Sequence, residues 1–141
     1  MTTDKYFFLH EIFYQRARKY AEIDEMKGIG QNVLSVAYSQ AILLISMYEF
    51  KTMNFPRAWL TVGKVARLVV MLGFNSVDAW NFDVKQCMPP PRDWIEQEER
   101  RRTFWCAFCA DRFASMGTGW PMVFDERDVS DKKQAAVFCD L

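Results

Sequence analysis

Cysteine and histidine are the residues of this sequence that could hold a metal ion or act as nucleophiles, because thiolates and imidazoles do both. Cys106 and Cys109 are separated by two residues, the spacing of many zinc and redox sites. No second pair accompanies them, and the single histidine, His10, lies at the other end of the chain. A redox pair also favours a helix N-terminus, whereas this pair falls in the middle of an expected helix. We therefore predict that both thiols are free and buried, and that the chain holds no metal.

Other catalytic patterns are missing from the sequence. It contains no glycine-rich phosphate loop, no Gly-x-Ser-x-Gly and no His-Glu-x-x-His motif. Carboxylates are plentiful, but nothing in their spacing singles out an acid–base pair. The sequence therefore predicts a protein that is not an enzyme, with no catalytic and no cofactor-binding residues.

The most basic stretch of the chain is balanced by acidic residues. Glu96 precedes Arg100 by four residues and Glu98 precedes Arg102 by four, so both pairs meet on one side of a helix. Residues 92–112 contain five basic and five acidic side chains, and the whole chain has 18 Lys and Arg against 18 Asp and Glu. Nucleic-acid-binding surfaces carry an excess of positive charge. We therefore predict a solvated, charge-paired helix start that does not contact DNA.

A second charged feature, Asp111-Arg112, falls beside aromatic residues. The members of adjoining helical rows are Arg101, Phe104, Trp105, Phe108, Asp111, Arg112 and Ser115. The aromatic members require burial, and a buried charge is unfavourable unless it is paired and hydrogen-bonded. Two interpretations follow: a polar site in a pocket, or a structural ion-pair network that fixes helix packing. The second is favoured.

Apolar residues recur at helical spacing in four segments, which predicts helices over residues 4–26, 31–52, 56–72 and 93–116. Thr3 is a possible cap of the first helix, Gly73 ends the third, and Asp93 with Glu96 forms a capping box at the start of the fourth. A long loop over residues 74–92, with three consecutive prolines, joins the third and fourth helices. A short amphipathic piece is expected at 134–138. No strand pattern competes, so we predict an all-α fold: a single compact domain of about four main helices.

Residues 28–48 carry no charged side chain, a run of 21 that requires comparison with a membrane span. Polar residues and two glycines interrupt the run. Its apolar positions favour one side of a helix: Val33, Val36, Ala37, Ala41, Leu44, Met47 and Tyr48. We predict a deeply buried helix of a soluble domain. The N-terminal residues show no secretion signal pattern, so an intracellular, reducing compartment is expected, in which the four cysteines form no disulfide framework.

A series of short motifs follows the expected helices. The main one comprises Arg101, Arg102, Phe104, Trp105, Asp111, Arg112, Ser115, Gly119 and Pro121, followed by the acidic turn 124–129. Upstream lie Ala-Arg-Lys-Tyr at 17–20, Gln-Ala-Ile-Leu-Leu at 40–44 and Leu-Gly-Phe at 72–74. In order and spacing, the series resembles the fungal-specific transcription factor domain, the middle homology region of fungal zinc-cluster transcription factors, over about residues 8–130. Trp120 departs from the pattern, because the family usually has arginine there.

The resemblance implies that residues 1–141 are a regulatory domain, incomplete at its C-terminal end, of a transcription factor that controls RNA polymerase II in the nucleus. Such proteins bind DNA through a separate six-cysteine zinc cluster, which the four scattered cysteines of this chain cannot build. Zinc and DNA contacts are therefore expected only outside this chain. The motif residues are expected to be structural.

The partners implied are another part of the same protein, a different protein, or a small-molecule effector, and not a membrane. An alternative remains: a stand-alone helical module that senses a small molecule or binds a protein without binding DNA. In that case the aromatic-rich stretch 74–94 would cover a pocket, and the eight methionines would suit an adaptable surface.

Overall fold

The computed structural model describes residues 8–77 and 87–125. They form four α-helices, α2 (Leu9–Met26), α3 (Val36–Lys51), α4 (Phe55–Met71) and α5 (Trp94–Thr118), and two short 3-10 turns, η1 (Gln31–Val33) and η2 (Phe74–Ser76). No β-strand occurs in these two ranges, so the predicted all-α class is confirmed. The expected cap at Thr3 and the amphipathic piece at 134–138 lie outside the described residues.

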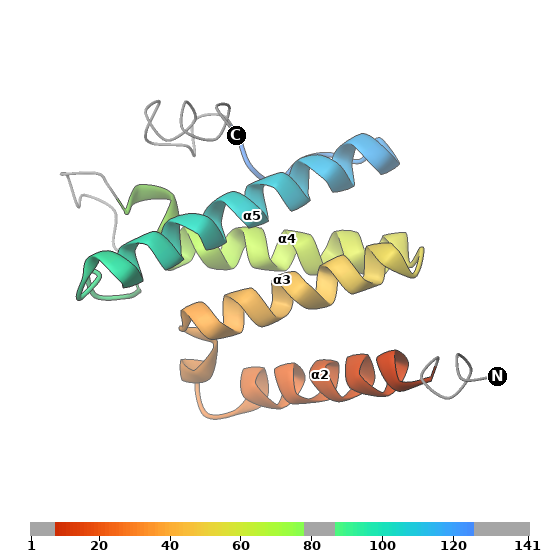
Figure 1. The fold of residues 1–141 in the computed structure, drawn as a ribbon, viewed down its shortest axis with the longest axis horizontal. Coiled ribbons are helices and arrows are strands. Elements are labelled where there is room, and N and C mark those ends of the chain that lie inside the picture. The colour runs from red at the N-terminus through yellow and green to blue at the C-terminus, as the bar shows by residue number, and fades with distance from the viewer. Residues whose placement is uncertain (1–7, 78–86, 126–141) are drawn as a thin grey trace.

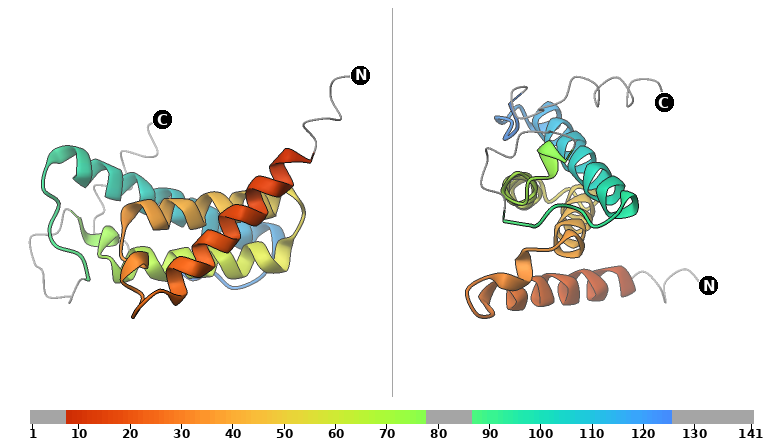
Figure 2. Two further views of the ribbon diagram at one scale, coloured as in Figure 1. Left: turned by 90° about the horizontal axis from the view of Figure 1, so that it is seen from below. Right: turned by 90° about the vertical axis from the view of Figure 1, so that its left-hand side faces the viewer.

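Helix α3 occupies the middle of the arrangement (Figure 1). Viewed from the left-hand side of Figure 1, it lies between α2 and the pair formed by α4 and α5 (Figure 2). The packing of α3 on α4 is the most extensive, followed by that of α4 on α5, whereas α2 contacts mainly α3. Helix α2 is therefore an outer layer on a three-helix core.

The start of α3 differs from the prediction. Residues 31–33 form a 3-10 turn, and the α-helix begins only at Val36. The reason is Ser35, whose extended backbone (φ −146°) interrupts the helical path. Its hydroxyl accepts a hydrogen bond from the N–H of Tyr38 at 3.1 Å, which satisfies one of the free N–H groups at the helix start.

The other helix ends agree with their sequence signals. Pro56 lies in the first turn of α4, and Gly73, with φ +79°, directly follows the C-cap of this helix. At the start of α5, the Asp93 side chain accepts from the N–H of Glu96 at 2.8 Å, as the capping box predicts. The helix continues to Thr118, two residues beyond its predicted end.

The predicted side of α3 is not the buried one. Ala37 and Ala41 are exposed, and Leu44 and Met47 have exposed fractions of 71% and 50%. The buried side is instead formed by Tyr38, Ser39, Ile42, Ile45, Ser46, Glu49 and Phe50. Apolar residues occur all round this helix, so its sequence pattern does not select a side. No helix in the described ranges is long and apolar enough to cross a membrane.

The buried side of α3 carries a carboxylate, Glu49, which is 0% exposed. Its Oε1 accepts a hydrogen bond from the Tyr14 hydroxyl of α2 at 2.7 Å, and lies 3.5 Å from Nη1 of Arg18. Arg57 of α4 donates to the Tyr14 oxygen at 3.2 Å. Burial, followed by the hydrogen bond to Glu49, raises the pKa of Tyr14. This polar junction therefore fixes α2 on α3 and α4, and no pattern in the sequence indicates it.

Candidate functional site

A carboxylate of α5 holds the segment that follows this helix. Asp111 is buried, with an exposed fraction of 1%. Its two oxygens lie 3.1 and 3.0 Å from the N–H nitrogen of Val123, and one of them also accepts from the N–H of Phe124 at 3.1 Å. Hydrogen bonds to a charged acceptor are about twice as strong as neutral ones. Asp111 therefore ties residues 119–124, which we call the strap, back onto α5.

The chain reverses between α5 and the strap at a glycine. Gly119 adopts φ +73°, a conformation that other residues rarely take, and its N–H donates to the carbonyl of Ser115 at 2.8 Å. The Thr118 hydroxyl accepts from the N–H of Trp120 at 3.2 Å and continues the turn. The Ser115 hydroxyl is buried and has no hydrogen-bond partner among the described residues.

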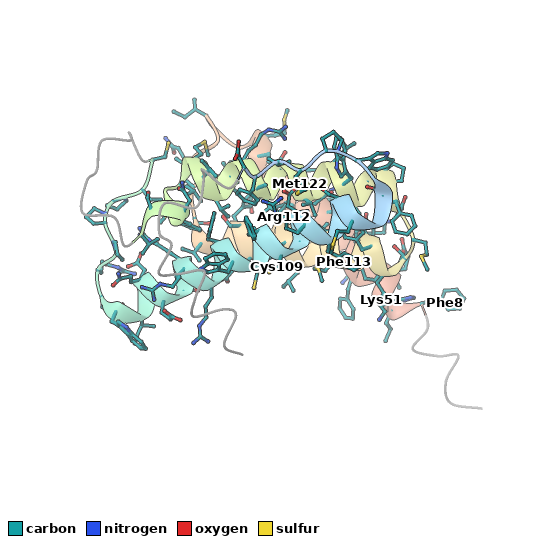
Figure 3. The ribbon with its side chains drawn as sticks, turned by 90° about the horizontal axis from the view of Figure 1, so that it is seen from above. Phe8, Lys51, Cys109, Arg112, Phe113 and Met122 are labelled. Atoms are coloured by element: carbon teal, nitrogen blue, oxygen red, sulfur yellow. The ribbon has the colours of Figure 1, made fainter. Side chains whose placement is uncertain are left out.

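Arg112 holds the strap from the other side. Its guanidinium carbon lies 4.7 Å from the centre of the Phe108 ring, within the range of a cation–π contact. The same group contacts the Met122 sulfur and donates to the carbonyl of Phe124 at 3.4 Å (Figure 3). Arg112 and Asp111 thus both form hydrogen bonds with the strap.

The predicted ion-pair network is therefore wrong in its partners. In the part of the chain that the structure describes, Asp111 receives backbone N–H groups and no guanidinium, while Arg112 bonds the strap. The interpretation as a polar pocket finds no support either, because both carboxylate oxygens are taken up by the backbone. The structure brings together the second half of the predicted set around the strap: Asp111, Arg112, Ser115, Gly119 and Pro121.

The aromatic members of the set lie deeper. Phe104 is 0% and Trp105 6% exposed, and their rings meet edge to face at 5.6 Å between centroids. The Phe104 ring also meets that of Phe124, from the strap, at 5.5 Å. Trp120, which stands where the family pattern has arginine, packs edge to face on Trp59 of α4 at 5.4 Å. Aromatic contacts thus join the strap to both α4 and α5.

The arginines at the start of α5 divide into two groups. Both predicted pairs are confirmed: Arg100 Nη2 lies 2.7 Å from Glu96, and Arg102 Nε lies 2.8 Å from Glu98, which Arg101 also contacts. Arg102 is exposed, as expected for a solvated helix start. Arg101 is half-buried.

The prediction of a solvated helix start is wrong for Arg100, which is only 3% exposed. Its Nη1 donates to the carbonyl of Pro89 at 2.8 Å, and its guanidinium carbon lies 6.0 Å from the centre of the Phe74 ring. Arg100 therefore fastens the proline segment to α5. Its spacing from Glu96 equals that of Arg102 from Glu98, so the sequence contains no signal that separates the buried arginine from the exposed one.

Glu96 collects three of these bonds at the helix start. It accepts from the N–H of Arg92 at 3.0 Å, from the Arg92 side chain at 3.0 Å and from Arg100 at 2.7 Å. Together these donors lower the pKa of Glu96 to about 2, with the Arg92 backbone bond as the largest cause.

The strap forms one wall of a groove along α4. The groove has a volume of about 680 Å³ and is lined mostly by apolar side chains of α4 and by strap residues 121–124. Arg67 supplies its charge, and this guanidinium also donates to the carbonyl of Gly63 at 3.1 Å. Nothing in this lining offers a nucleophile or an acid–base pair, so the groove is suited to binding rather than to catalysis.

The cysteine prediction is correct in one respect and wrong in another. Cys106 and Cys109 are free thiols, but both are exposed on the outer side of α5, as Figure 3 shows for Cys109. Partial burial, and to a smaller extent Cys106, raises the pKa of Cys109, so its thiol is less ionised than usual. No group of three or more metal-ligating side chains occurs in the described ranges.

Comparison with known proteins places this arrangement in a family. The model of the fungal specific transcription factor domain matches residues 3–130, which is most of the chain. The chain belongs to this family. The resemblance of its motifs is thereby confirmed, and the strap and its two holding residues lie within the matched range.

Relatives of this fungal transcription factor domain regulate biosynthesis, according to their names. The chain is 33% identical over 123 residues to the pigment biosynthesis transcriptional activator pigB of Monascus ruber. The aligned region covers 86% of this chain and 22% of that protein. The chain is 30% identical over 122 residues to the ascochitine biosynthesis cluster transcriptional regulator of Didymella fabae, covering 86% and 21%. It is 28% identical over 127 residues to the citrinin biosynthesis transcriptional activator mrl3 of Monascus ruber, covering 90% and 24%.

The chain therefore spans about a fifth of the length of the curated relatives that it matches. No solved structure matches it. The comparisons establish the family of this domain, and the relatives are named as activators or regulators of biosynthesis.

Proposed function

We propose that this domain is part of a pathway-specific transcription factor that controls RNA polymerase II transcription of a biosynthetic gene cluster in the nucleus. The observation that carries the proposal is the family match over residues 3–130, together with relatives named as activators or regulators of biosynthesis. In this proposal the chain binds no cofactor and catalyses no reaction. Zinc and DNA are bound by a zinc cluster outside it.

The charge distribution supports a role apart from DNA. The three arginines at the start of α5, Arg100, Arg101 and Arg102, are paired with glutamates, and the net charge of the chain is zero. Duplex DNA is held mainly through phosphate neutralisation by unpaired cations. The task of this domain is then to regulate, through contacts with protein or with a small effector.

The test is genetic and uses the complete gene. Deletion of the gene that encodes this chain should lower the transcripts of one group of co-regulated biosynthetic genes, as measured by RNA sequencing. Reintroduction of the intact gene should restore them, as should a gene with the surface change Glu22→Gln, whereas Asp111→Ala should not. Unchanged transcripts of every such group after deletion would contradict the proposal.

A second measurement separates the alternative of a stand-alone module. The complete coding sequence should contain a six-cysteine cluster outside these 141 residues, and the purified 141-residue chain should not retard duplex DNA in a gel. A complete gene without that cluster would favour a sensing or protein-binding module that does not contact DNA.

A further inference from the structure

A second, more apolar groove runs between α2 and α3, on the side of α3 that the core leaves uncovered. It has a volume of about 750 Å³, within the range of about 300–1,000 Å³ that is typical of small-molecule pockets. We call it the α2–α3 groove. Its size is therefore suited to a single small organic molecule.

The groove has a buried floor and an exposed rim. Tyr14, Tyr38 and Ile45 line it and belong to the hydrophobic core, so packing holds this part of the groove in place. Phe13 and Tyr20 also line it, yet each is 65% exposed. Exposed side chains change rotamer within nanoseconds. The rim can therefore turn over a bound molecule while the floor stays fixed.

The lining alternates small and aromatic side chains. Ala17 of α2 and Ala37 and Ala41 of α3 are exposed and line the groove, so they leave room beside the helix backbones. The larger lining residues are mostly aromatic: Phe13, Tyr14, Tyr20, Tyr38 and Tyr48. Aromatic rings pack favourably on other rings, in offset stacks or edge to face. The lining therefore favours a ligand with a flat, aromatic body.

Polar side chains that could orient a ligand gather at one end of the groove. Asp24, Asn32 and Ser35 line this end, whereas His10 lies at the other end of the α2 lining, about 21 Å away at the rise of an α-helix. Asn32 donates to Oδ1 of Asp24 at 3.4 Å, and no residue that the structure describes donates to Oδ2. A mostly apolar cavity with a few polar groups that fix orientation is the usual construction of a ligand pocket.

The charge of the lining is negative. It contains one carboxylate, that of Asp24, and no lysine or arginine. Burial, followed by the charge of Asp24, raises the pKa of Tyr38 to about 12, so this phenol stays neutral beside the carboxylate. An ammonium group would therefore meet an opposite charge in the groove, and a carboxylate would meet a like one. The faces of the aromatic rings add to this preference, because they attract cations.

The cations of α2 do not reverse this preference. All of them lie outside the lining: Arg16, Arg18 and Lys19. Arg18 lies 3.5 Å from the buried Glu49, and the other two are exposed, where salt screens their charge. Asp24 is therefore the charge that a molecule inside the groove meets first.

We propose that the α2–α3 groove binds a small lipophilic aromatic amine, with its protonated nitrogen against Asp24 and its rings over Ala37 and Ala41. The nitrogen donates to the carboxylate oxygen that Asn32 leaves open. A helix of another protein is a less suitable occupant, because the lining offers it a charge at one end alone. The inference rests on the proposed function in one respect, since the amine would be the small effector of the regulatory domain. Binding itself depends only on the residues of the groove.

The test uses the purified 141-residue chain and three probes that share a naphthylbutyl skeleton. The probes end in an ammonium, a hydroxyl or a carboxylate group, so they differ mainly in charge at neutral pH. Isothermal titration calorimetry at low salt should show the ammonium probe binding at least about tenfold more tightly than the carboxylate probe, which corresponds to about 1.4 kcal/mol. The hydroxyl probe should lie between them. High salt should reduce the difference, because screening weakens the charge contact.

One pair of variants locates the charge. Asp24→Asn removes the carboxylate and keeps its shape, so it should abolish the preference for the ammonium probe over the carboxylate probe. Glu22→Gln is the matched control, because it removes a carboxylate of the same helix that lies outside the lining. This control should keep the preference of the unmodified chain.

A second pair of variants locates the body of the ligand. Ala41→Trp fills the groove from an exposed position, so it should abolish binding of all three probes while thermal unfolding stays unchanged. Leu60→Trp is the matched control, because Leu60 is 66% exposed on α4 and lines the other groove. Its affinities should equal those of the unmodified chain. The comparison of Asp24→Asn with Glu22→Gln decides the proposal independently of how well Ala41→Trp folds.

Four results would overturn the proposal: equal affinities of the ammonium and carboxylate probes, an unchanged preference in Asp24→Asn, unchanged binding in a folded Ala41→Trp, and no binding of any probe. If no probe binds and the chain sediments as a dimer that Ala41→Trp dissociates, the groove belongs to a second copy of the chain. None of these results bears on the transcripts that change after gene deletion. Failure of this inference is therefore distinguishable from failure of the proposed function.

Discussion

The hold of Asp111 on the strap can be tested by removing its carboxylate. In Asp111→Ala, two backbone N–H groups, those of Val123 and Phe124, lose an acceptor that lies 3.0 to 3.1 Å away. A hydrogen bond to a charged group contributes about 1.5–3 kcal/mol, so the two together contribute about 3–6 kcal/mol before other terms. The alanine variant also avoids the burial of a carboxylate, which offsets part of this loss.

We therefore expect Asp111→Ala to lower the free energy of unfolding by about 3 kcal/mol, a large part of the 5–15 kcal/mol that holds a typical domain. Asp111→Asn keeps one acceptor oxygen and should lower it by roughly half as much. Urea denaturation with an unchanged m-value is the measurement. Glu22→Gln, in an exposed and loosely paired carboxylate, is the control and should stay within about 0.5 kcal/mol.

Hydrogen exchange supplies a local readout of the same contact. The amides of Val123 and Phe124 should exchange slowly in the unmodified chain and quickly in Asp111→Ala, while core amides of α4 remain protected. A loss below about 1 kcal/mol, or continued protection of these two amides in Asp111→Ala, would refute the argument that the carboxylate holds the strap.

Three further predictions concern the helix ends and the buried junction. Gly119→Ala should lower the free energy of unfolding by about 1 kcal/mol; a Cβ there meets no neighbour, so the positive φ alone causes the loss. Gly117→Ala, inside α5 and equally open, should instead raise it by about 0.5–1 kcal/mol. Changes of the same sign in thermal unfolding of the two variants would contradict this. The pKa of Glu96 is lowered to about 2, so the stability that its charged form contributes is present above its ordinary pKa and is lost as the pH falls toward 2. The difference in unfolding free energy between the unmodified chain and Glu96→Gln should therefore shrink between pH 5 and 2 in urea titrations. A difference that stays constant over this range would contradict the prediction. Tyr14→Phe leaves Oε1 of Glu49 without its hydroxyl donor at 2.7 Å and should lower the free energy of unfolding in urea by about 1–3 kcal/mol. Tyr20→Phe, at an exposed site, should leave it unchanged. Similar effects of the two changes would refute the role of the junction.

Helix positions and the family assignment were accessible from the sequence because they depend on local signals. Pro56, Gly73 and the pair Asp93 and Glu96 act through backbone groups within a few residues, so each is read correctly without knowledge of the fold. The order of the motifs identified the family for the same reason, since it is a property of the chain alone. The start of α3 is the exception: the predicted helix began at residue 31, but the extended backbone of Ser35 delays its start to Val36.

The candidate site was only partly accessible. The sequence placed Asp111 and Arg112 beside a buried face, but it predicted an ion-pair network as their role. The partners that they have are backbone groups of Val123 and Phe124, which approach only because Gly119 turns the chain back along α5. Nearly every residue type carries a backbone N–H, so no sequence pattern indicates which one a buried carboxylate will bind.

What the sequence determined by itself was the all-α class, most helix ends, the paired charges of α5 and membership of the family, because each follows from spacing along one chain. Only the tertiary structure decided which sides are covered. Apolar residues occur all round α3, so its packing against the other helices selects Ile42 over Leu44 for the core. In the same way, packing buries Arg100, which has the same helical spacing to its glutamate as the exposed Arg102, and leaves Cys109 in solvent. The burial of a residue depends on neighbours that are distant in sequence, so the local sequence pattern does not predict it at these positions.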